Sequence, residues 1–493
     1  MLVALIIPLI ESVRNGPSIL IIGAGPSGIA AATKLLKNNY TSIKIFEAED
    51  RIGGRIRSVE FGDAFVDLGA EWCHGEKENI VYDMINQYNV LRHTNLSYKL
   101  VYSNGKYIDD DVYQALIDFA DSIDASVTNE ETEKNCQGLQ SIGECFQKQF
   151  NASFTKRYST DSGKLKLAVD SADWLECYMA TYDSTFSLQD LSRRSNYKRC
   201  EGDLRLNWNG RGYKTILELM MQKFPDTSKQ LPLDERIVLR KEVTKILWRH
   251  NNSKVVVQSS GNGSDEFDHV IFTPSLGVLK ASHDSLFDPP LSVEKVTAIR
   301  NFGFGATFKI AMHFPKTWWN VSELYGFVWS AEDEKKITSD FPEGPFKNGR
   351  SWLTTSTKFF QAEHNPKVMI AFFAGEMVPD LEKESDQVLI DGCMYLFKTF
   401  LGSNYSVVEP DSIIRSSWYT NPHFRGTYSY ESVKGGSGSR YPEELGKPLR
   451  NEDERPTVLF AGEATHPYYF STVHGAIESG YREADRLINL YSS

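Results

Sequence analysis

Two short apolar runs, separated by a glycine-rich turn and a helical stretch, open the chain. Ser18–Ile22 (SILII) is apolar over nearly its whole length, which is typical of a strand buried on both faces of a parallel sheet. A helix-forming segment, Ile29–Asn39, follows the turn, and Ser42–Phe46 (SIKIF) is a second apolar run. This order predicts a strand–helix–strand unit near the N-terminus.

The turn has the spacing Gly-x-Gly-x-x-Gly, with its glycines at Gly23, Gly25 and Gly28. In a dinucleotide-binding unit the first glycine permits the tight turn and the second lets the backbone approach a pyrophosphate. The third allows close packing of the helix on the strand, and the helix N-terminus offers free N–H groups to phosphate. Glu47 ends the second run and is placed to accept hydrogen bonds from ribose hydroxyls. An acid there favours FAD or NAD over NADP.

Two further segments favour FAD over NAD. Glu47 is followed by a Gly-Gly-Arg turn. In this turn Gly54 can present its amide to phosphate, and Arg55 can add a charge-assisted contact. Beyond it, Gly69–Trp72 (GAEW) ends an apolar stretch and suits a backbone that lies against a ring system.

The C-terminal end has a matching strand, turn and helix. Thr457–Ala461 is apolar and leads into Gly462 and Glu463. An aromatic cluster, His466–Phe470, follows, and a helix is expected to start at Ser471. This arrangement suits the pyrophosphate or ribityl part of a flavin, although on its own it also fits an ordinary strand and helix at the end of a domain.

The central part of the chain is expected to contribute strands at Val255–Val257, Asp268–Thr273 and Pro274–Leu279. Farther on, Arg300–His313 alternates apolar residues with small or polar ones, so Lys309 points to the opposite face from its neighbours. A lysine on a strand more often extends to solvent, and the pattern alone leaves that interpretation open.

Together these segments resemble the flavin-containing amine oxidase family, and within it the animal polyamine oxidases. The resemblance runs from Ser18 to the end and is most specific at 462–487 (GEATHPYYFSTVHGAIESGYREADRL). It implies an α/β fold, in which an FAD-binding Rossmann-like domain of the GR2 type is interwoven with an α+β substrate-binding domain. The implied FAD-binding segments are 17–100, 231–290 and 410–493, and the implied substrate segments are 101–230, a helical insert, and 291–409.

The resemblance also implies which residues contact FAD. They are Gly23, Gly25, Gly28, Glu47, Gly54, Arg55, Gly69, Ala70, Glu71, Trp72, Val243, Trp418, Gly462, Glu463, Thr472 and Val473. Within this set Val243 matches backbone beside the adenine. Trp418 belongs to an aromatic block that, in the family, lines the flavin and the substrate tunnel.

Two residues match catalytic positions of the family. Lys309 stands where the family has a lysine that holds a water molecule near flavin N5, and His74 stands where it has a histidine beside the substrate amine. The family commonly has an uncharged residue at the position of Glu71. This departure either adds a carboxylate near a cationic substrate or leaves one pointing away.

Three residues are expected to contact substrate in addition to His74. Tyr430 is expected to form a wall of the cavity, and Ser471 and Thr472 match positions that contact the distal nitrogen of the substrate in animal enzymes. Aromatic walls attract a cationic amine, but aromatic residues also fill protein cores.

The implied activity is FAD-dependent oxidation of a polyamine (spermine, spermidine or an N1-acetyl form) at a carbon beside a secondary amine. Its products are an aldehyde, a shorter amine and H2O2, and O2 is the second substrate. Two alternatives remain open. An amino-acid oxidase would need an arginine aimed at a carboxylate, for which Arg425 and Arg211 are candidates. A flavoprotein that binds amines without turnover is the other. The sequence does not indicate which polyamine is used or which C–N bond is cleaved.

Composition restricts the partners. The net charge of −11 argues against nucleic acid, and no apolar run reaches the roughly 18 residues that span a bilayer. The six cysteines show no metal-ligand spacing. We expect no metal and a monomer.

The compartment is a separate expectation. Leu2–Ile10 has the length of a signal-peptide core but lacks a basic flank. Four cysteines lie between Cys136 and Cys200, close enough in sequence for one or two disulfides, and the chain has Asn-x-Ser/Thr sequons. The sequon asparagines are Asn39, Asn95, Asn151, Asn251, Asn262, Asn320 and Asn404. These features favour the secretory pathway; the alternative is a cytoplasmic protein with six free thiols.

Overall fold

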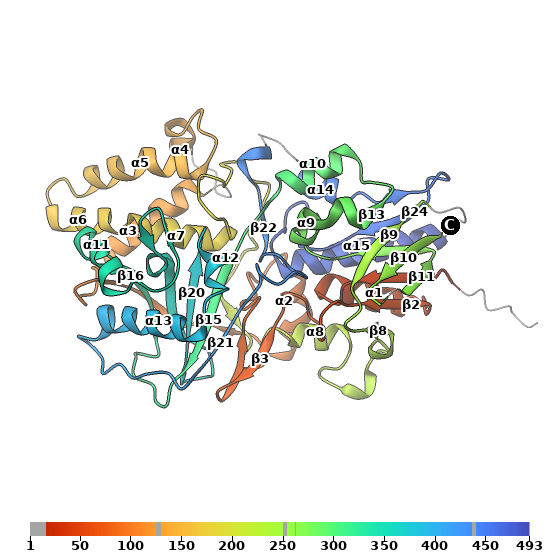
Figure 1. The fold of residues 1–493 in the computed structure, drawn as a ribbon, viewed down its shortest axis with the longest axis horizontal. Helices are drawn as coiled ribbons and strands as arrows, with labels where there is room; N and C mark the ends of the chain where they lie inside the picture. The colour runs from red at the N-terminus through yellow and green to blue at the C-terminus, as the bar shows by residue number, and fades with distance from the viewer. Residues whose placement is uncertain (1–15, 125–129, 250–253, 262, 436–439, 493) are drawn as a thin grey trace, which may run out of the picture.

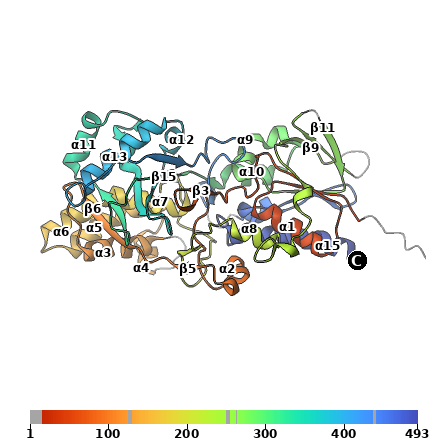
Figure 2. The same ribbon diagram turned by 90° about the horizontal axis from the view of Figure 1, so that it is seen from below.

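Two six-stranded sheets dominate the computed structural model and lie apart along its long axis (Figures 1 and 2). The structure describes residues 16–124, 130–249, 254–261, 263–435 and 440–492. The apolar stretch Leu2–Ile10 and the sequon residues Asn251 and Asn262 lie outside the described residues.

The first sheet contains the predicted strand–helix–strand unit. Its strand order is β23 (Leu449–Arg450), β24 (Pro456–Phe460), β12 (His269–Phe272), β1 (Ile19–Ile22), β2 (Ile43–Phe46), β8 (Ile237–Val238). All neighbours are parallel except β23 and β24. Helix α1 (Pro26–Lys37) joins β1 to β2, which confirms the prediction for this region.

Alternate residues of β1 face different layers, which explains the continuous apolar run. Ile19 and Ile21 pack with α1 and with α15 (Val473–Ser492). Leu20 and Ile22 pack on the opposite side, against a small sheet and helix α9 (Leu276–Leu286). The small sheet has the order β11 (Gly263–Phe267), β10 (Val255–Ser259), β9 (Val243–Leu247), β13 (Phe287–Asp288).

The expectation of a strand at Pro274–Leu279 is wrong. Helix α9 begins at Leu276, and the Ser275 hydroxyl caps it by accepting a hydrogen bond from the N–H of Val278, at 3.2 Å. The apolar residues of this segment therefore follow a helical period, and the serine that precedes them is an N-cap residue.

The second sheet is mostly antiparallel. Its order is β21 (Ser412–Arg415), β15 (Thr307–His313), β20 (Val368–Ala374), β19 (Ser356–Gln361), β16 (Glu323–Val328), β6 (Ser97–Tyr102), and only β16 and β6 run parallel. The helices in this half are α3 (Asp110–Ile123), α4 (Glu130–Asn135), α5 (Ile142–Arg157), α6 (Ser162–Asp170), α7 (Ala172–Asp183), α11 (Ala331–Asp340), α12 (Val378–Leu381) and α13 (Asp386–Leu401) (Figure 1).

Short strands also pair in twos outside the larger sheets. The strand β14 (Gly303–Phe304) pairs with β22 (Ser429–Tyr430), β3 (Ser58–Phe61) with β4 (Ala64–Asp67), β5 (Arg92–His93) with β7 (Leu206–Asn207), and β17 (Phe346–Lys347) with β18 (Arg350–Ser351). The remaining helices are α2 (Ile80–Ile85), α8 (Thr215–Met220), α10 (Val293–Asn301) and α14 (Tyr441–Gly446). No helix in the described ranges is long and apolar enough to cross a membrane.

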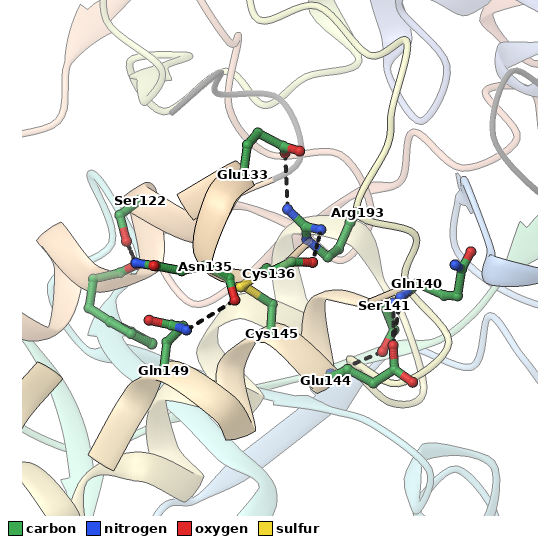
Figure 3. The surroundings of a disulfide bond; sticks show 11 residues. Ser122, Glu133, Asn135, Cys136, Gln140, Ser141, Glu144, Cys145, Gln149 and Arg193 are labelled. Atoms are coloured by element: carbon green, nitrogen blue, oxygen red, sulfur yellow. Dashed lines mark hydrogen bonds and ion pairs between the residues drawn. A yellow bond between two sulfur atoms is a disulfide. The ribbon is translucent and has the colours of Figure 1, made fainter. Parts of the chain in front are cut away.

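A disulfide joins Cys136 to Cys145 beside the helical layer (Figure 3). Cys136 follows α4, and Cys145 lies in the first turn of α5, whose N-terminus is closed by a capping box between Ser141 and Glu144. Arg193 donates to the carbonyl of Cys136 at 2.6 Å. Cys73, Cys177, Cys200 and Cys393 are free thiols.

Candidate active site

A cleft lies at the carboxyl ends of the first sheet's parallel strands, with about 1200 Å³ of space free of protein atoms, counted out to the adjoining solvent. Strands β1, β2 and β12 deliver Gly23, Glu47 and Thr273 to its wall, the position at which parallel α/β sheets bind ligands. Most of the residues expected to contact FAD line this cleft. They are Gly23, Gly25, Glu47, Gly54, Arg55, Ala70, Val243, Gly462, Glu463, Thr472 and Val473, and Ser471 lies beside them.

Two helix N-termini open onto the cleft. Gly25 is the N-cap of α1, and its extended backbone (φ −75°) precedes Pro26, which has no N–H to leave unsatisfied. Thr472 precedes α15, and its hydroxyl accepts a hydrogen bond from the N–H of Gly475 at 3.0 Å. Two positive dipole ends at one place form an anion site, as a pyrophosphate requires.

Close packing of the backbone explains two expected residues that do not line the cleft. A Cβ on Gly28 would lie 2.0 Å from the carbonyl oxygen of Gly23, so any side chain there would push α1 off β1. A Cβ on Gly69 would lie 1.9 Å from the carbonyl oxygen of Arg55. Trp418 packs against the segment that contains Gly69, and its indole N–H donates to the carbonyl of Leu68 at 2.9 Å.

Glu47 is buried at the end of β2. Its carboxylate accepts hydrogen bonds from the N–H groups of Ala24 (2.7 Å) and Glu49 (2.8 Å). Burial raises the pKa of this carboxyl, although both N–H groups oppose the rise. The remaining lone pairs are available to ribose hydroxyls. Val243, at the start of β9, lines the cleft near it.

Glu463 organises the centre of the cleft. Its carboxylate accepts hydrogen bonds from Arg55 (2.9 Å), from the hydroxyl of Ser429 (2.6 Å) and from the N–H of Ser471 (2.7 Å). The bond to Ser471 holds a non-glycine residue at a φ of 69°. This buried acid therefore positions Arg55 beside the two helix N-termini.

A buried lysine lies next to the strand end that carries Gly69 and Ala70. The ammonium of Lys309, on β15, donates to the carbonyl oxygens of Asp67 (3.0 Å) and Gly69 (2.8 Å) and to the Glu71 carboxylate (2.6 Å). Both charged side chains are largely buried, with 8% and 14% of their surfaces exposed. Lys309 therefore faces inward and does not extend to solvent. Glu71 pairs with it rather than pointing away.

Part of the His74 side chain is exposed to solvent, although protein atoms surround its imidazole closely enough to reduce its hydration. Its Nδ1 lies 2.5 Å from the carbonyl oxygen of Leu204, so Nδ1 carries the proton and Nε2 keeps a lone pair. Burial and the nearby Lys358 and Lys309 lower the pKa of the imidazole, whereas the Leu204 carbonyl opposes the change. A neutral imidazole with a free Nε2 accepts a hydrogen bond from an amine.

The residues of the cleft fit an extended dinucleotide with a ring system at one end. Glu47 would accept hydrogen bonds from a ribose, the two helix N-termini and Arg55 would bind a pyrophosphate, and the inward-facing Lys309 donates to the carbonyl of Gly69, beside Ala70. Among the described residues no cluster of His, Cys, Asp and Glu could hold a metal ion.

Comparison with known families agrees with this geometry. The family described as flavin containing amine oxidoreductases matches residues 26–488. The chain belongs to this family. It is an FAD-dependent amine oxidase, and FAD is its cofactor.

Curated relatives cover nearly its whole length. It is 30% identical over 512 residues to human peroxisomal N(1)-acetyl-spermine/spermidine oxidase. The alignment covers 97% of this chain and 96% of the relative. It is 26% identical to polyamine oxidase 1 of Zea mays, over 96% of this chain and 91% of the relative. The protein anon-37Cs of Drosophila lebanonensis is 27% identical, over 98% and 89%.

Other expected residues of the amine oxidase take different positions. Tyr430 is buried on Gly303, where a Cβ would lie 2.3 Å from its ring, and it does not line the cleft; its neighbours Thr427 and Tyr428 do. Trp72 stacks on Phe372, with ring centroids 6.3 Å apart.

Neither arginine considered for a carboxylate substrate reaches this site. The guanidinium of Arg211 lies over the ring of Phe224, at 4.7 Å. Arg425 is exposed, and its carbonyl packs against Gly277.

Sequence reasoning missed a second lysine, Lys358 on β19. Its ammonium lies 4.7 Å from the ring of Trp72 and 4.2 Å from that of Phe372. No local motif marks this residue. Only the register of β19 against β20 brings it to the site.

Proposed function

We propose that this amine oxidase oxidises a polyamine or an N-acylated polyamine at a carbon beside a secondary amine, with O2 as the electron acceptor. The observation that carries the proposal is the imidazole of His74, whose Nδ1 donates to the Leu204 carbonyl and leaves Nε2 as the acceptor. Burial, together with Lys358 and Lys309, lowers the pKa of this imidazole and favours its neutral form. The names of the relatives, which act on acetylated spermine and spermidine or on polyamines, support the same substrate class.

In this proposal each residue has a defined task. FAD, when bound, supplies the two-electron acceptor. His74 accepts a hydrogen bond from the N–H of the substrate amine. This contact orients the amine so that the lone pair of its nitrogen stays aligned with the carbon that is oxidised. Lys309 provides a fixed positive charge at the site, and Glu71 holds it in place through their 2.6 Å contact. The product imine is hydrolysed to an aldehyde and a shorter amine.

A second acid offers a place for the other end of a cationic substrate. Asp183 is the last residue of α7; burial raises the pKa of the Tyr428 and Tyr430 phenols, and the negative charge of Asp183 adds to that rise. Burial raises the pKa of Asp183 itself to about 7. A substrate ammonium that arrives beside this carboxyl would favour its ionised form. Ser471 and Thr472, which line the cleft, are proposed to contact the same end.

We also propose the division of the chain into FAD-binding segments (17–100, 231–290 and 410–493) and substrate segments (101–230 and 291–409). All strands of the first sheet fall within the first set. Most strands of the second sheet fall within the second set. Two of its strands, β6 and β21, lie at or just outside these limits.

Secretion of a monomer is the proposed setting. The Cys136–Cys145 disulfide supports an oxidising compartment. Every sequon asparagine that the structure describes is exposed. A cytoplasmic location is the alternative, and the human relative is named peroxisomal.

The test is a peroxide-coupled assay on the FAD-loaded protein with spermine, spermidine, their N1-acetyl forms, a monoamine and several L-amino acids. Turnover of a polyamine, with the aldehyde identified by mass, supports the proposal. Turnover of amino acids alone would refute the substrate class. A Lys309→Met variant should keep FAD bound and lose most of its rate of reaction with O2.

A further inference from the structure

Three residues on adjacent strands form a row across the second sheet. Phe372 on β20 is paired in register with Lys309 on β15 and with Lys358 on β19. Residues directly opposite one another in a sheet project from the same face. Accordingly, both ammonium groups lie over the ring of Phe372, at 4.6 Å for Lys309 and 4.2 Å for Lys358. Lys358 therefore shares the face of the sheet from which Lys309 reaches Glu71.

The two lysines differ in their partners. All three N–H donors of Lys309 have an acceptor: two carbonyl oxygens and Glu71. Among the residues that the structure describes, the ammonium of Lys358 has neither a hydrogen-bond acceptor nor an ion-pair partner. Instead, the ammonium of Lys358 lies beside two aromatic rings, those of Trp72 and Phe372, and the residue is less buried than Lys309.

The surroundings of Lys358 penalise its charge. Burial lowers its pKa to about 7, and the positive charges of Lys309 and Arg205 add to this effect, whereas Glu71 opposes it. Glu71 cannot neutralise both lysines, because its carboxylate is already paired with Lys309. A half-buried ammonium without an acceptor costs stability, and methionine would fill the same space without that cost.

We propose that Lys358 determines substrate specificity by donating a hydrogen bond to an oxygen acceptor on the substrate, and by repelling a substrate that brings an ammonium group to the same place. The inference rests on the proposed amine oxidase activity. The acceptor is either the carbonyl oxygen of an N-acyl group or a carboxylate. Trp72 and Phe372 contribute apolar surface beside the acceptor, which suits the methyl of an acetamide.

The test compares Lys358→Met and Lys358→Arg with the unmodified, FAD-loaded enzyme. Lys99→Met is the matched control, because Lys99 lies on β6 of the same sheet but pairs with exposed Asp110 at 2.9 Å. The substrates are N1-acetylspermine, spermine, and a spermidine analogue in which a carboxylate replaces one terminal aminomethyl group. The first and third distinguish an acyl oxygen from a carboxylate as the source of the acceptor.

Loss of a charged donor to a bound oxygen lowers affinity by about tenfold or more. We expect Lys358→Met to lower kcat/KM for N1-acetylspermine relative to spermine by at least about tenfold, mainly through KM. Lys358→Arg should keep most of the preference, and Lys99→Met should change nothing. If the carboxylate analogue alone loses rate, the acceptor is a carboxylate.

An equal loss for all three substrates, or no change in their ratio, would overturn the proposal, because a proton acceptor or a purely structural lysine would act on every substrate alike. Calorimetric titration with N-acetylputrescine, which has an amide oxygen but no secondary amine, provides a second measurement without turnover. Its affinity should fall at least about tenfold in Lys358→Met. Silence of the unmodified enzyme with every amine would refute the proposed function alone, and the titration would still decide whether Lys358 binds an oxygen acceptor.

Discussion

The ammonium of Lys309 lies 2.6 Å from a carboxylate oxygen of Glu71, and backbone carbonyl oxygens take its two other donors. A lysine with every donor occupied has none left for a water molecule. In this enzyme a water near Lys309 must therefore displace one of these acceptors or be held by Glu71 itself. The carboxylate also offsets the positive charge of Lys309 on this face of the sheet.

Glu71→Gln tests this relationship. Removal of the carboxylate leaves Lys309 with an uncompensated positive charge, which favours reduction of the bound flavin. We expect the flavin midpoint potential, measured by dye equilibration, to rise by about 30 mV, the equivalent of about 1.4 kcal/mol for a two-electron couple. Glu201→Gln is the control, because it removes a carboxylate from an exposed pair with Lys77. Equal potentials in all three proteins would mean that the pair does not act on the flavin.

His74→Ala should weaken substrate use without loss of FAD. The imidazole contributes one acceptor, so we expect kcat/KM for the preferred amine to fall by about tenfold to a hundredfold. Burial and two lysines hold the pKa of His74 below its ordinary value, so it stays neutral above pH 6.5. The pH profile of kcat should therefore show no ionisation of His74 between about pH 7 and 9. A profile that changes in this range only in the unmodified enzyme would contradict the assignment.

His269 makes stability depend on pH. The buried imidazole donates from Nδ1 to the carbonyl of Pro456 (2.7 Å), and Nε2 accepts from the hydroxyl of Tyr491 (2.7 Å). Burial lowers its pKa to about 4, whereas the unfolded chain has a value near 6.5. Between these values the unfolded state binds more protons, so stability is complete above about pH 6.5 and falls as pH drops toward 4, by about 3 kcal/mol. Urea unfolding at several pH values measures this loss, and His269→Gln should reduce its slope. An equally steep slope in that variant would assign the loss to other groups.

The sequence predicted the parts of the site that are defined by turn glycines and by residues at the ends of strands. Gly23, Gly25, Glu47 and Gly462 all line the cleft, because a turn glycine or a strand-end acid has a fixed place relative to its own strand. The strand–helix–strand unit followed from the same local signals.

The remaining features depend on contacts between distant segments. Lys358 reaches the site through the register of β19 on β20, which no nearby residue signals. The pairing of Glu71 with Lys309 spans 238 residues. At Pro274–Leu279 an apolar run was compatible with both a strand and a helix, and the Ser275 cap together with packing on the first sheet selected the helix.

The Cys136–Cys145 disulfide should contribute measurably to the free energy of unfolding, and its presence in the native protein tests the proposed secretory location. It closes a loop with a sequence separation of 9 between α4 and α5. In the chain-entropy treatment a loop of this size stabilises the fold by about 2–3 kcal/mol. We expect the Cys136→Ser/Cys145→Ser double variant to lose about that much free energy of unfolding in urea, with Cys177→Ser, which changes a partly exposed free thiol, as the control. Intact mass of the native protein should shift by two hydrogens on reduction under denaturing conditions, and a larger loss of mass should follow glycosidase treatment. A protein that shows neither shift when purified from its source would be a reduced, unglycosylated one, and the proposal of a secretory location would then be wrong.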